Sequence, residues 1–78
     1  MMHNINIIHE DSEIYIINKP AGIASQGGEK VTSSIDTVFA EQVGQKIYLV
    51  HRLDKDTSGL MIIAKNPTSA NKWTKLIS

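Results

Sequence analysis

The chain has 78 residues, no cysteine, and equal numbers of basic and acidic residues, eight of each. A chain of this length forms one small domain that buries only about 60–65% of its unfolded surface, and without cysteine neither a disulfide nor a thiolate metal site can stabilise it. No apolar run approaches the roughly 20 residues of a membrane span, and the first residues lack the basic and long apolar segments of a signal peptide. We therefore expect a soluble, cytoplasmic protein.

Charge is distributed unevenly along the chain. Residues 1–45 contain two lysines and six acidic residues, whereas residues 46–78 contain six basic residues and two aspartates. The net charge is therefore −4 in the first part and +4 in the second. A basic segment favours a phosphate-bearing partner, although a solvated surface with scattered lysines is the alternative explanation.

The first elements predict an antiparallel β-hairpin. Residues 5–8 and 14–18 are rich in isoleucine, which favours strands, and the polar residues 9–13 form the connection between them. The second strand must stop near Pro20, because proline cannot donate to a strand ladder. The glycine pair Gly27-Gly28 indicates that a loop follows.

A helix is predicted over residues 34–43. Ser33 is expected to be its N-cap, with Asp36 three residues later in a capping box, and Gly44 is a suitable C-cap. The apolar residues of this segment recur at helical spacing and define one buried face: Ile35, Val38, Phe39 and Val43.

The second half of the chain predicts two more strands and a final helix. Apolar runs at 47–50 and 60–65 predict strands. Asn66 as N-cap and Pro67 at the first helical position open a helix over 67–77. Four apolar residues form a stripe on this helix: Ala70, Trp73, Leu76 and Ile77. We expect the stripe to lie in the core rather than to stack on bases, and an exposed apolar face if the surface that it covers is missing. The predicted fold class is α+β, with two helices and a mixed, mainly antiparallel sheet.

The charged residues that could carry chemistry gather between the last two strands. His51, Arg52, Asp54 and Asp56 lie in a polar turn that ends at Gly59. A loop that is held by strands is a common place for catalytic side chains.

Calcium binding is one interpretation of this loop, because Asp54-x-Asp56-x-Ser58-Gly59 fits the first half of an EF-hand. The twelfth position should be a bidentate glutamate, but it is Lys65, and the flanking segments are predicted strands rather than helices. The three histidines lack the spacing of zinc ligands. The sequence therefore predicts no metal site.

Two segments resemble a known family. His51-Arg52-Leu53-Asp54, followed by Thr57-Ser58-Gly59, resembles the catalytic motif of the RluA-type pseudouridine synthases. Asn18-Lys19-Pro20-Ala21-Gly22 resembles the segment that precedes this motif in the family. The resemblance implies an enzyme that isomerises uridine to pseudouridine in ribosomal or transfer RNA, without a metal or a cofactor.

The resemblance also assigns roles to residues of this chain. Asp54 corresponds to the catalytic aspartate, acting as nucleophile or as base, and the target base must leave its stack to reach it. The expected substrate-binding residues are His51, Arg52, Thr57, Ser58 and Gly59. We also expect His51 to shape the loop through a hydrogen bond, with proton transfer as the alternative. Lys19 is expected to be a solvated lysine at the end of a strand, with a phosphate contact at the rim of the site as the alternative.

Part of the family's pattern has no counterpart here. The family carries a tyrosine that stacks on the target uracil and a basic residue that pairs with the aspartate, both after the segment matched by this chain. We therefore expect residues 1–78 to be a truncated, N-terminal portion of a single catalytic domain, inactive without its remaining C-terminal part. A non-catalytic RNA-binding remnant or module is the alternative. Residual RNA affinity would come from four cations: Arg52, Lys55, Lys72 and Lys75.

Overall fold

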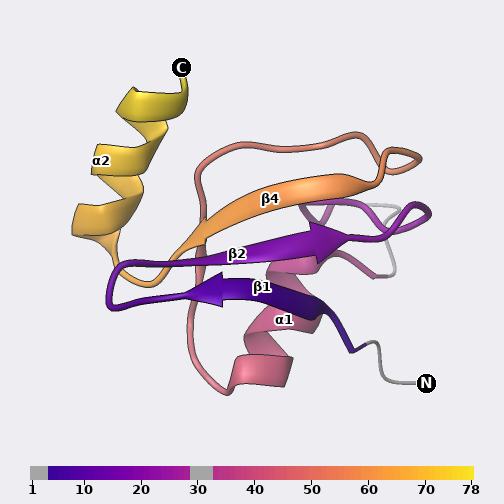
Figure 1. Ribbon diagram of the computed structural model, residues 1–78. Coiled ribbons are helices and arrows are strands. Elements are labelled where there is room, and N and C mark those ends of the chain that lie inside the picture. Colours follow the sequence, from indigo (N-terminus) through magenta and orange to yellow (C-terminus); the bar gives the residue numbers. More distant parts are fainter. Residues whose placement is uncertain (1–3, 29–32) are drawn as a thin grey trace.

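The computed structural model describes residues 4–28 and 33–78. The chain forms, in order, β1 (Asn6–Glu10), β2 (Ile14–Lys19), α1 (Ile35–Val43), β3 (Tyr48–Leu49), β4 (Gly59–Ala64) and α2 (Pro67–Ile77). The strands make one sheet in the order β1-β2-β4-β3, and neighbouring strands are antiparallel. Helix α1 lies against one face of the sheet, and α2 stands beside the end where β4 finishes (Figure 1). The predicted α+β class is confirmed.

Strands β2 and β4 form the centre of the sheet. Their ladder runs from Ile14 opposite Ala64 to Lys19 opposite Gly59. Side chains alternate between the two faces of a strand, so Tyr15 and Ile17 on β2 point to the α1 side and are buried. By contrast, β1 is exposed along its whole length and has an irregular register between Ile7 and His9. The sheet is therefore anchored by β2 and β4.

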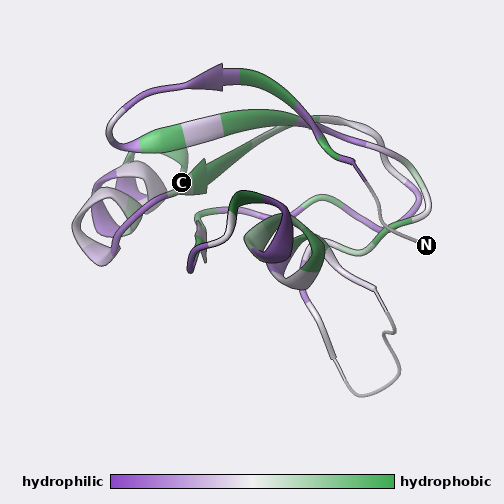
Figure 2. Ribbon diagram, turned by 90° about the horizontal axis from the view of Figure 1, so that it is seen from below, coloured by the Kyte–Doolittle hydropathy of each residue, from purple (hydrophilic) through white to green (hydrophobic). Residues whose placement is uncertain are grey.

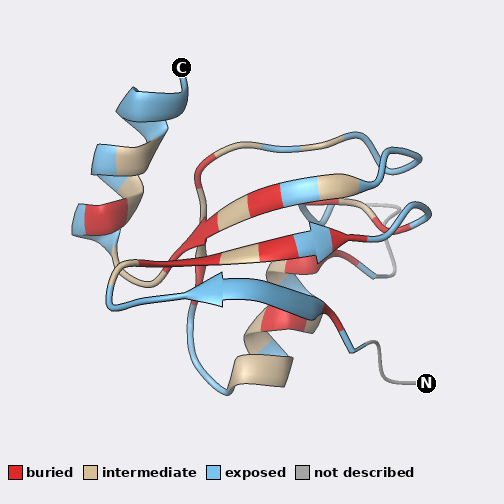
Figure 3. Cartoon of the chain, in the orientation of Figure 1, coloured by how far each residue is buried: buried red, intermediate tan, exposed pale blue. Residues whose placement is uncertain are grey.

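The hydrophobic core lies between the sheet and α1. Ile35 and Phe39 of α1 are fully buried there, and Val38 and Val43 pack against the same cluster as predicted. The rings of Phe39 and Tyr15 meet edge to face, with centroids 5.0 Å apart, a favourable aromatic geometry. Figures 2 and 3 show the hydrophobic and buried residues along the central strands and on α1.

The predicted capping box of α1 is wrong. The N-cap is Ser34 rather than Ser33, and its side chain makes no capping hydrogen bond. The first N–H groups of the helix instead donate to loop carbonyls, from Ile35 to Ala24 (2.8 Å) and from Asp36 to Ser25 (3.2 Å). Because the carbonyls of Ala24 and Ser25 accept from the first N–H groups of α1, the helix begins beside this loop and needs no side-chain cap. The C-cap Gly44 is left-handed (φ 72°), as predicted.

Helix α2 begins as predicted, with the Asn66 side chain accepting from the Ser69 N–H at 2.8 Å and Pro67 in the first turn. The expectation that its apolar stripe lies in the core is wrong. Leu76 and Ile77 are 64% and 41% exposed, and Ser69 is the one buried residue of the helix. The stripe is not buried because the last turns of α2 project beyond the sheet (Figures 1 and 3). Within residues 4–28 and 33–78, no helix has the length and apolar character needed to cross a bilayer.

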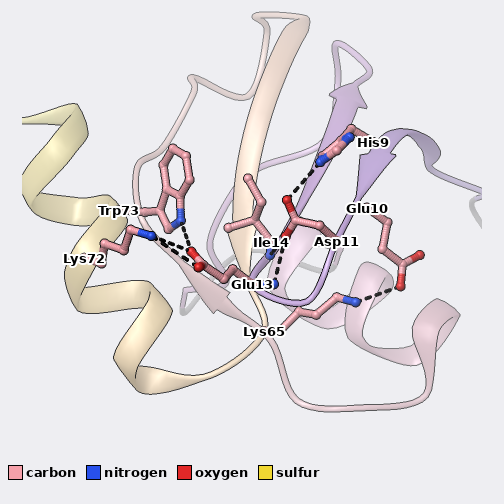
Figure 4. Close-up of polar contacts among 8 residues, drawn as sticks. All are labelled: His9, Glu10, Asp11, Glu13, Ile14, Lys65, Lys72 and Trp73. Carbon is pink, nitrogen blue, oxygen red and sulfur yellow. Dashed lines mark hydrogen bonds and ion pairs between the residues drawn. The ribbon is translucent and has the colours of Figure 1, made fainter.

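Side-chain charges hold α2 to the β1–β2 turn. Glu13 accepts from Lys72 Nζ at 2.9 Å and from the Trp73 indole N–H at 3.1 Å (Figure 4). Nearby, Asp11 accepts from His9 and from the N–H groups of Glu13 and Ile14, and Lys65 pairs with Glu10 at 2.8 Å. We call this group the hairpin-turn cluster: His9, Glu10, Asp11, Glu13, Lys65, Lys72 and Trp73. Trp73 is therefore a partly buried anchor rather than a core residue.

Candidate functional site

Two loops meet at the opposite end of the sheet from the hairpin-turn cluster. Residues 20–28, here called the clamp loop, follow β2. Residues 50–58, here called the motif loop, lead into β4. The clamp loop lies where β2 ends and β4 begins, because these strands are antiparallel neighbours. The motif loop starts after β3, at the other end of β4, and runs along β4 to reach the same place (Figure 1). The strands that flank the motif loop, β3 and β4, are those predicted, and they are incompatible with the helices of an EF-hand.

Asp54 opens a tight turn in the motif loop. The Thr57 N–H donates to the Asp54 carbonyl at 3.0 Å, which is the i to i+3 bond of a β-turn, and aspartate is favoured at the first position of such turns. The residue is exposed, so its carboxylate is accessible. It borders an open hollow of ≈ 370 Å³. The lining residues are Ala24, Ser25, Gln26, Arg52, Leu53, Asp54 and Lys55.

The clamp loop fixes the backbone on both sides of Asp54. The buried Ser25 hydroxyl donates to the Leu53 carbonyl at 2.7 Å and accepts from the Leu53 N–H at 2.9 Å. On the other side, the Gly22 N–H donates to the Lys55 carbonyl at 2.7 Å. Gly22 has φ 95°, a conformation that suits glycine. Neutral hydrogen bonds from one loop therefore set the path of the other.

Lys19 is buried, so the expectation of a solvated lysine is wrong. Its ammonium donates to three carbonyls, those of Thr57 (2.6 Å), Pro20 (3.1 Å) and Lys55 (3.3 Å). The chain turns at Pro20 and the motif loop folds over the side chain, which encloses it. Burial lowers the pKa of Lys19, while the negative charges of Asp56 and Asp54 act in the opposite direction. Lys19 therefore ties the motif loop to the end of β2.

His51 shapes the motif loop through a hydrogen bond, as predicted. Its Nε2 accepts from the Ile62 N–H in β4 at 3.0 Å, which requires that this nitrogen carry no proton. Burial lowers the pKa of the imidazole and so favours the neutral ring that the bond needs.

Arg52 and Gln26 form the most exposed contact between the two loops. Arg52 Nη1 donates to Gln26 Oε1 at 2.8 Å. Both residues border the hollow at Asp54 and also a second hollow of ≈ 480 Å³ on the side of α2. The second hollow is lined by Gln26, Leu49, Val50, His51, Arg52 and Thr74. The pair thus belongs to the walls of both hollows.

The remaining predicted site residues lie at the end of the motif loop. Thr57 and Ser58 are exposed, and Gly59 begins β4 with φ 145°, a value that favours glycine. The sequence interpretation missed the buried position of Lys19 and the roles of Ser25 and Gln26. The Asn18–Gly22 match pointed to this region, but no pattern in the sequence signals contacts between residues 28 or 26 positions apart.

The site combines an accessible carboxylate with nearby cations. Arg52 and Lys55 are exposed beside Asp54, and the ion pairs found in residues 4–28 and 33–78 do not include Asp54. A carboxylate of this kind can serve as a nucleophile or as a base, and exposed cations attract phosphates.

The sequence matches the family model described as RNA pseudouridylate synthase over residues 13–78, which include both loops. It is 52% identical over 68 residues to the ribosomal large subunit pseudouridine synthase C of Rickettsia bellii. It is 45% identical over 79 residues to the ribosomal large subunit pseudouridine synthase D of Buchnera aphidicola. These matches cover 85% and 94% of this chain but only 23% and 25% of the two relatives.

The fold of the chain is also similar to that of a protein of known structure. The human protein named RNA Pseudouridylate Synthase Domain Containing 4 is similar with a TM-score of 0.71 and 31% sequence identity. The similarity covers 92% of this chain and 29% of the human one. The chain therefore spans less than a third of the length of each of these proteins.

Proposed function

Because the chain belongs to the RNA pseudouridylate synthase family, we propose that its site takes part in the isomerisation of uridine to pseudouridine in RNA, with Asp54 as the catalytic residue. In this reaction the bond from C1′ to N1 breaks and a bond from C1′ to C5 forms. The proton on C5 leaves and N1 gains one, so no oxidant or cofactor is consumed. The observation that carries the proposal is the family match across both loops, with Asp54 accessible in a hollow.

The geometry supports a role for Asp54 beyond that of an ordinary surface carboxylate. Its neighbours Leu53 and Lys55 are held by Ser25 and Gly22 of the clamp loop. A group that is fixed before the substrate arrives loses less entropy on the way to the transition state. The same fixed loop would present a carboxylate to the sugar of a nucleotide that has left its stack.

We propose that the exposed residues around Asp54 contact the RNA. Arg52 and Lys55 would bind backbone phosphates, and Thr57, Ser58 and Gly59 would shape the turn that faces the nucleotide. His51 would act indirectly, because its Nε2 is already engaged by the Ile62 N–H. Of the other predicted cations, Lys72 is paired with Glu13, and Lys75 is exposed in the last turn of α2.

We also propose that residues 1–78 correspond to the first portion of one catalytic domain and do not catalyse the reaction alone. The family's stacking tyrosine has no equivalent among the tyrosines of this chain. Tyr15 is buried against Phe39, and its hydroxyl accepts from Gln45 at 2.8 Å, whereas Tyr48 is half-buried in β3. The substrate would be ribosomal or transfer RNA, and the location cytoplasmic.

The test compares the 78-residue chain with a fusion in which the segment that follows the match in the Rickettsia bellii relative is added after Ser78. Pseudouridine is measured by chromatography of nucleosides after incubation with structured ribosomal or transfer RNA. We expect turnover by the fusion and none by the chain alone. In the fusion, Asp54→Asn should lower the rate by more than about 10³-fold, since losing even one preorganised electrostatic group costs about 10²–10³.

Asp56→Asn is the matched control, because Asp56 is an exposed aspartate of the same turn and should retain most of the activity. Full activity of the Asp54→Asn fusion would refute the assignment of the catalytic residue. Turnover by the 78-residue chain would refute the proposal that it is inactive alone. RNA binding without turnover in every form would favour the alternative, a non-catalytic RNA-binding module.

A further inference from the structure

The contact between Gln26 and Arg52 is the most informative feature of the site that the proposed function leaves unexplained. The guanidinium Nη1 lies 2.8 Å from the Gln26 amide oxygen, and both side chains are exposed. Long exposed side chains lose rotamer freedom when they are held in one geometry. This entropic cost favours the interpretation that a fixed position of the Arg52 guanidinium serves ligand binding.

Gln26 can hold Arg52 because its own position is fixed. The preceding residue, Ser25, is 3% exposed and makes two hydrogen bonds to the backbone of Leu53. The following residue, Gly27, donates its N–H to the Asp36 carboxylate at the start of α1. Two neighbouring contacts therefore join the loops: Ser25 binds the backbone of Leu53, and Gln26 binds the side chain of Arg52.

The chemistry of the partner matters as much as its position. An amide oxygen accepts a hydrogen bond without a charge, so the guanidinium stays positive towards solvent. The ion pairs found in the part of the chain that the structure describes lie at the hairpin-turn cluster and do not involve Arg52. A guanidinium has five N–H donors, so the bond from Nη1 leaves most of them available to a ligand.

We propose that Gln26 is a positioning residue for Arg52, which it holds between the two hollows with its charge available for an RNA phosphate. The inference rests on the proposed function, which makes RNA the substrate. It adds that the partner of Arg52 must be a neutral acceptor. A carboxylate at position 26 would hold the guanidinium equally well but would cancel its charge, whereas a methyl group would leave the charge and lose the orientation.

Loss of charge and loss of orientation at Arg52 have different effects on the salt dependence of RNA binding by the 78-residue chain. Affinity for a structured, uridine-containing RNA hairpin is measured as a function of salt. Gln26→Glu should reduce the slope of log K against log salt by about 0.7–0.9, the value for one phosphate contact. At about 0.1 M salt this corresponds to roughly five- to eightfold weaker binding. Gln26→Ala should leave the slope unchanged and weaken binding roughly two- to tenfold, because Arg52 must then be ordered on binding.

A double-mutant cycle separates positioning from a general effect on the fold. In the Arg52→Ala background, Gln26→Ala should have no further effect on affinity. Asn71→Asp is the matched control for the added charge, since Asn71 is exposed on α2 and lines neither hollow; it should change the slope much less than Gln26→Glu. Thermal unfolding should be the same for all these single variants.

A measurement without RNA keeps the inference separate from the proposed function. The NMR signal of the Arg52 Nε–H group should report a more mobile side chain in Gln26→Ala than in the wild type or Gln26→Glu. If the wild type does not bind RNA, the proposed function loses its support, while this signal still tests the contact. Equal mobility in all three proteins, a wild-type slope in Gln26→Glu, or an undiminished effect of Gln26→Ala without Arg52 would overturn the inference.

Discussion

The two ends of the β2–β4 ladder differ in how their charged side chains are used. At the end where Ile14 faces Ala64, the carboxylates of the hairpin-turn cluster accept hydrogen bonds from side chains of β1 and α2, from Lys65 and from backbone N–H groups of the turn (Figure 4). At the end where Lys19 faces Gly59, backbone and hydroxyl groups make most of the contacts between the loops, and the buried Lys19 ammonium donates to carbonyls rather than to a carboxylate. Asp54, Lys55 and Arg52 are left exposed there.

The difference separates a structural use of charge from a functional one. Exposed ion pairs contribute little stability each, but several together can define how a helix and a hairpin turn meet. A site that binds a charged substrate needs the reverse arrangement, in which neutral bonds fix the backbone and the charged side chains remain available. The clamp loop provides such bonds to Leu53 and Lys55.

Lys19→Met should have the largest effect, because it removes a buried charged group that holds the motif loop to the end of β2. The carbonyls of Thr57, Lys55 and Pro20 would each lose a donor. Hydrogen bonds to charged groups contribute about 1.5–3 kcal/mol, so we expect the free energy of unfolding in urea to fall by about 2–3 kcal/mol. Lys75→Met, at an exposed position of α2, is the control and should change it little.

Hydrogen exchange shows whether the loss is local. In Lys19→Met, amide protection should fall in the motif loop and at the start of β4 while the turn at residues 11–14 keeps its protection. Equal loss at both ends would mean that Lys19 supports the whole sheet, and the contrast between the two ends would then fail.

Lys19 also shows what the sequence could and could not predict. The strands and helices followed from apolar spacing, Pro20 and Pro67, and Gly44, because these signals are local. The motif loop and its flanking strands were predicted for the same reason. The burial of Lys19 and the contacts of Ser25 and Gln26 depend on residues 26 to 38 positions away, and local patterns do not encode such pairings. Helical spacing identified the apolar face that includes Leu76 but could not decide whether the sheet reaches it, and the core placement that we favoured is wrong.

His51 gives a smaller, pH-dependent test of the motif end. Its Nε2 accepts from the Ile62 N–H, and burial lowers the pKa of the ring from the usual 6.5. A lowered pKa in the folded state means that the unfolded chain binds more protons as the pH falls below about 6.5. Stability from this bond is therefore complete above pH 6.5 and is lost as the pH falls through the folded-state pKa.

Exchange of the Ile62 amide, corrected for the intrinsic effect of pH, should report this loss between about pH 7 and 5. Amides of the β2–β4 ladder nearer to Ile14 serve as the internal control and should keep their protection. His9→Gln, at the other end of the sheet, should leave the Ile62 profile unchanged. A pH-independent Ile62 amide would show that the imidazole is not its acceptor.

Asp11 provides the corresponding test of the hairpin-turn cluster, with the smallest expected effect because the residue is exposed. The hydrogen bond from His9, followed by those from the Ile14 and Glu13 N–H groups, lowers the pKa of Asp11 from 3.8 to about 2. Its contribution is therefore complete above about pH 4 and is lost as the pH falls through about 2.

In urea unfolding, the wild type should lose more stability between pH 5 and 3 than Asp11→Asn, whose amide oxygen can still accept from the two N–H groups but does not titrate. Glu41→Gln, on the exposed side of α1, controls for removal of a carboxylate and should retain the wild-type pH dependence. If Asp11→Asn also retained it, the acid sensitivity would arise from a group other than Asp11.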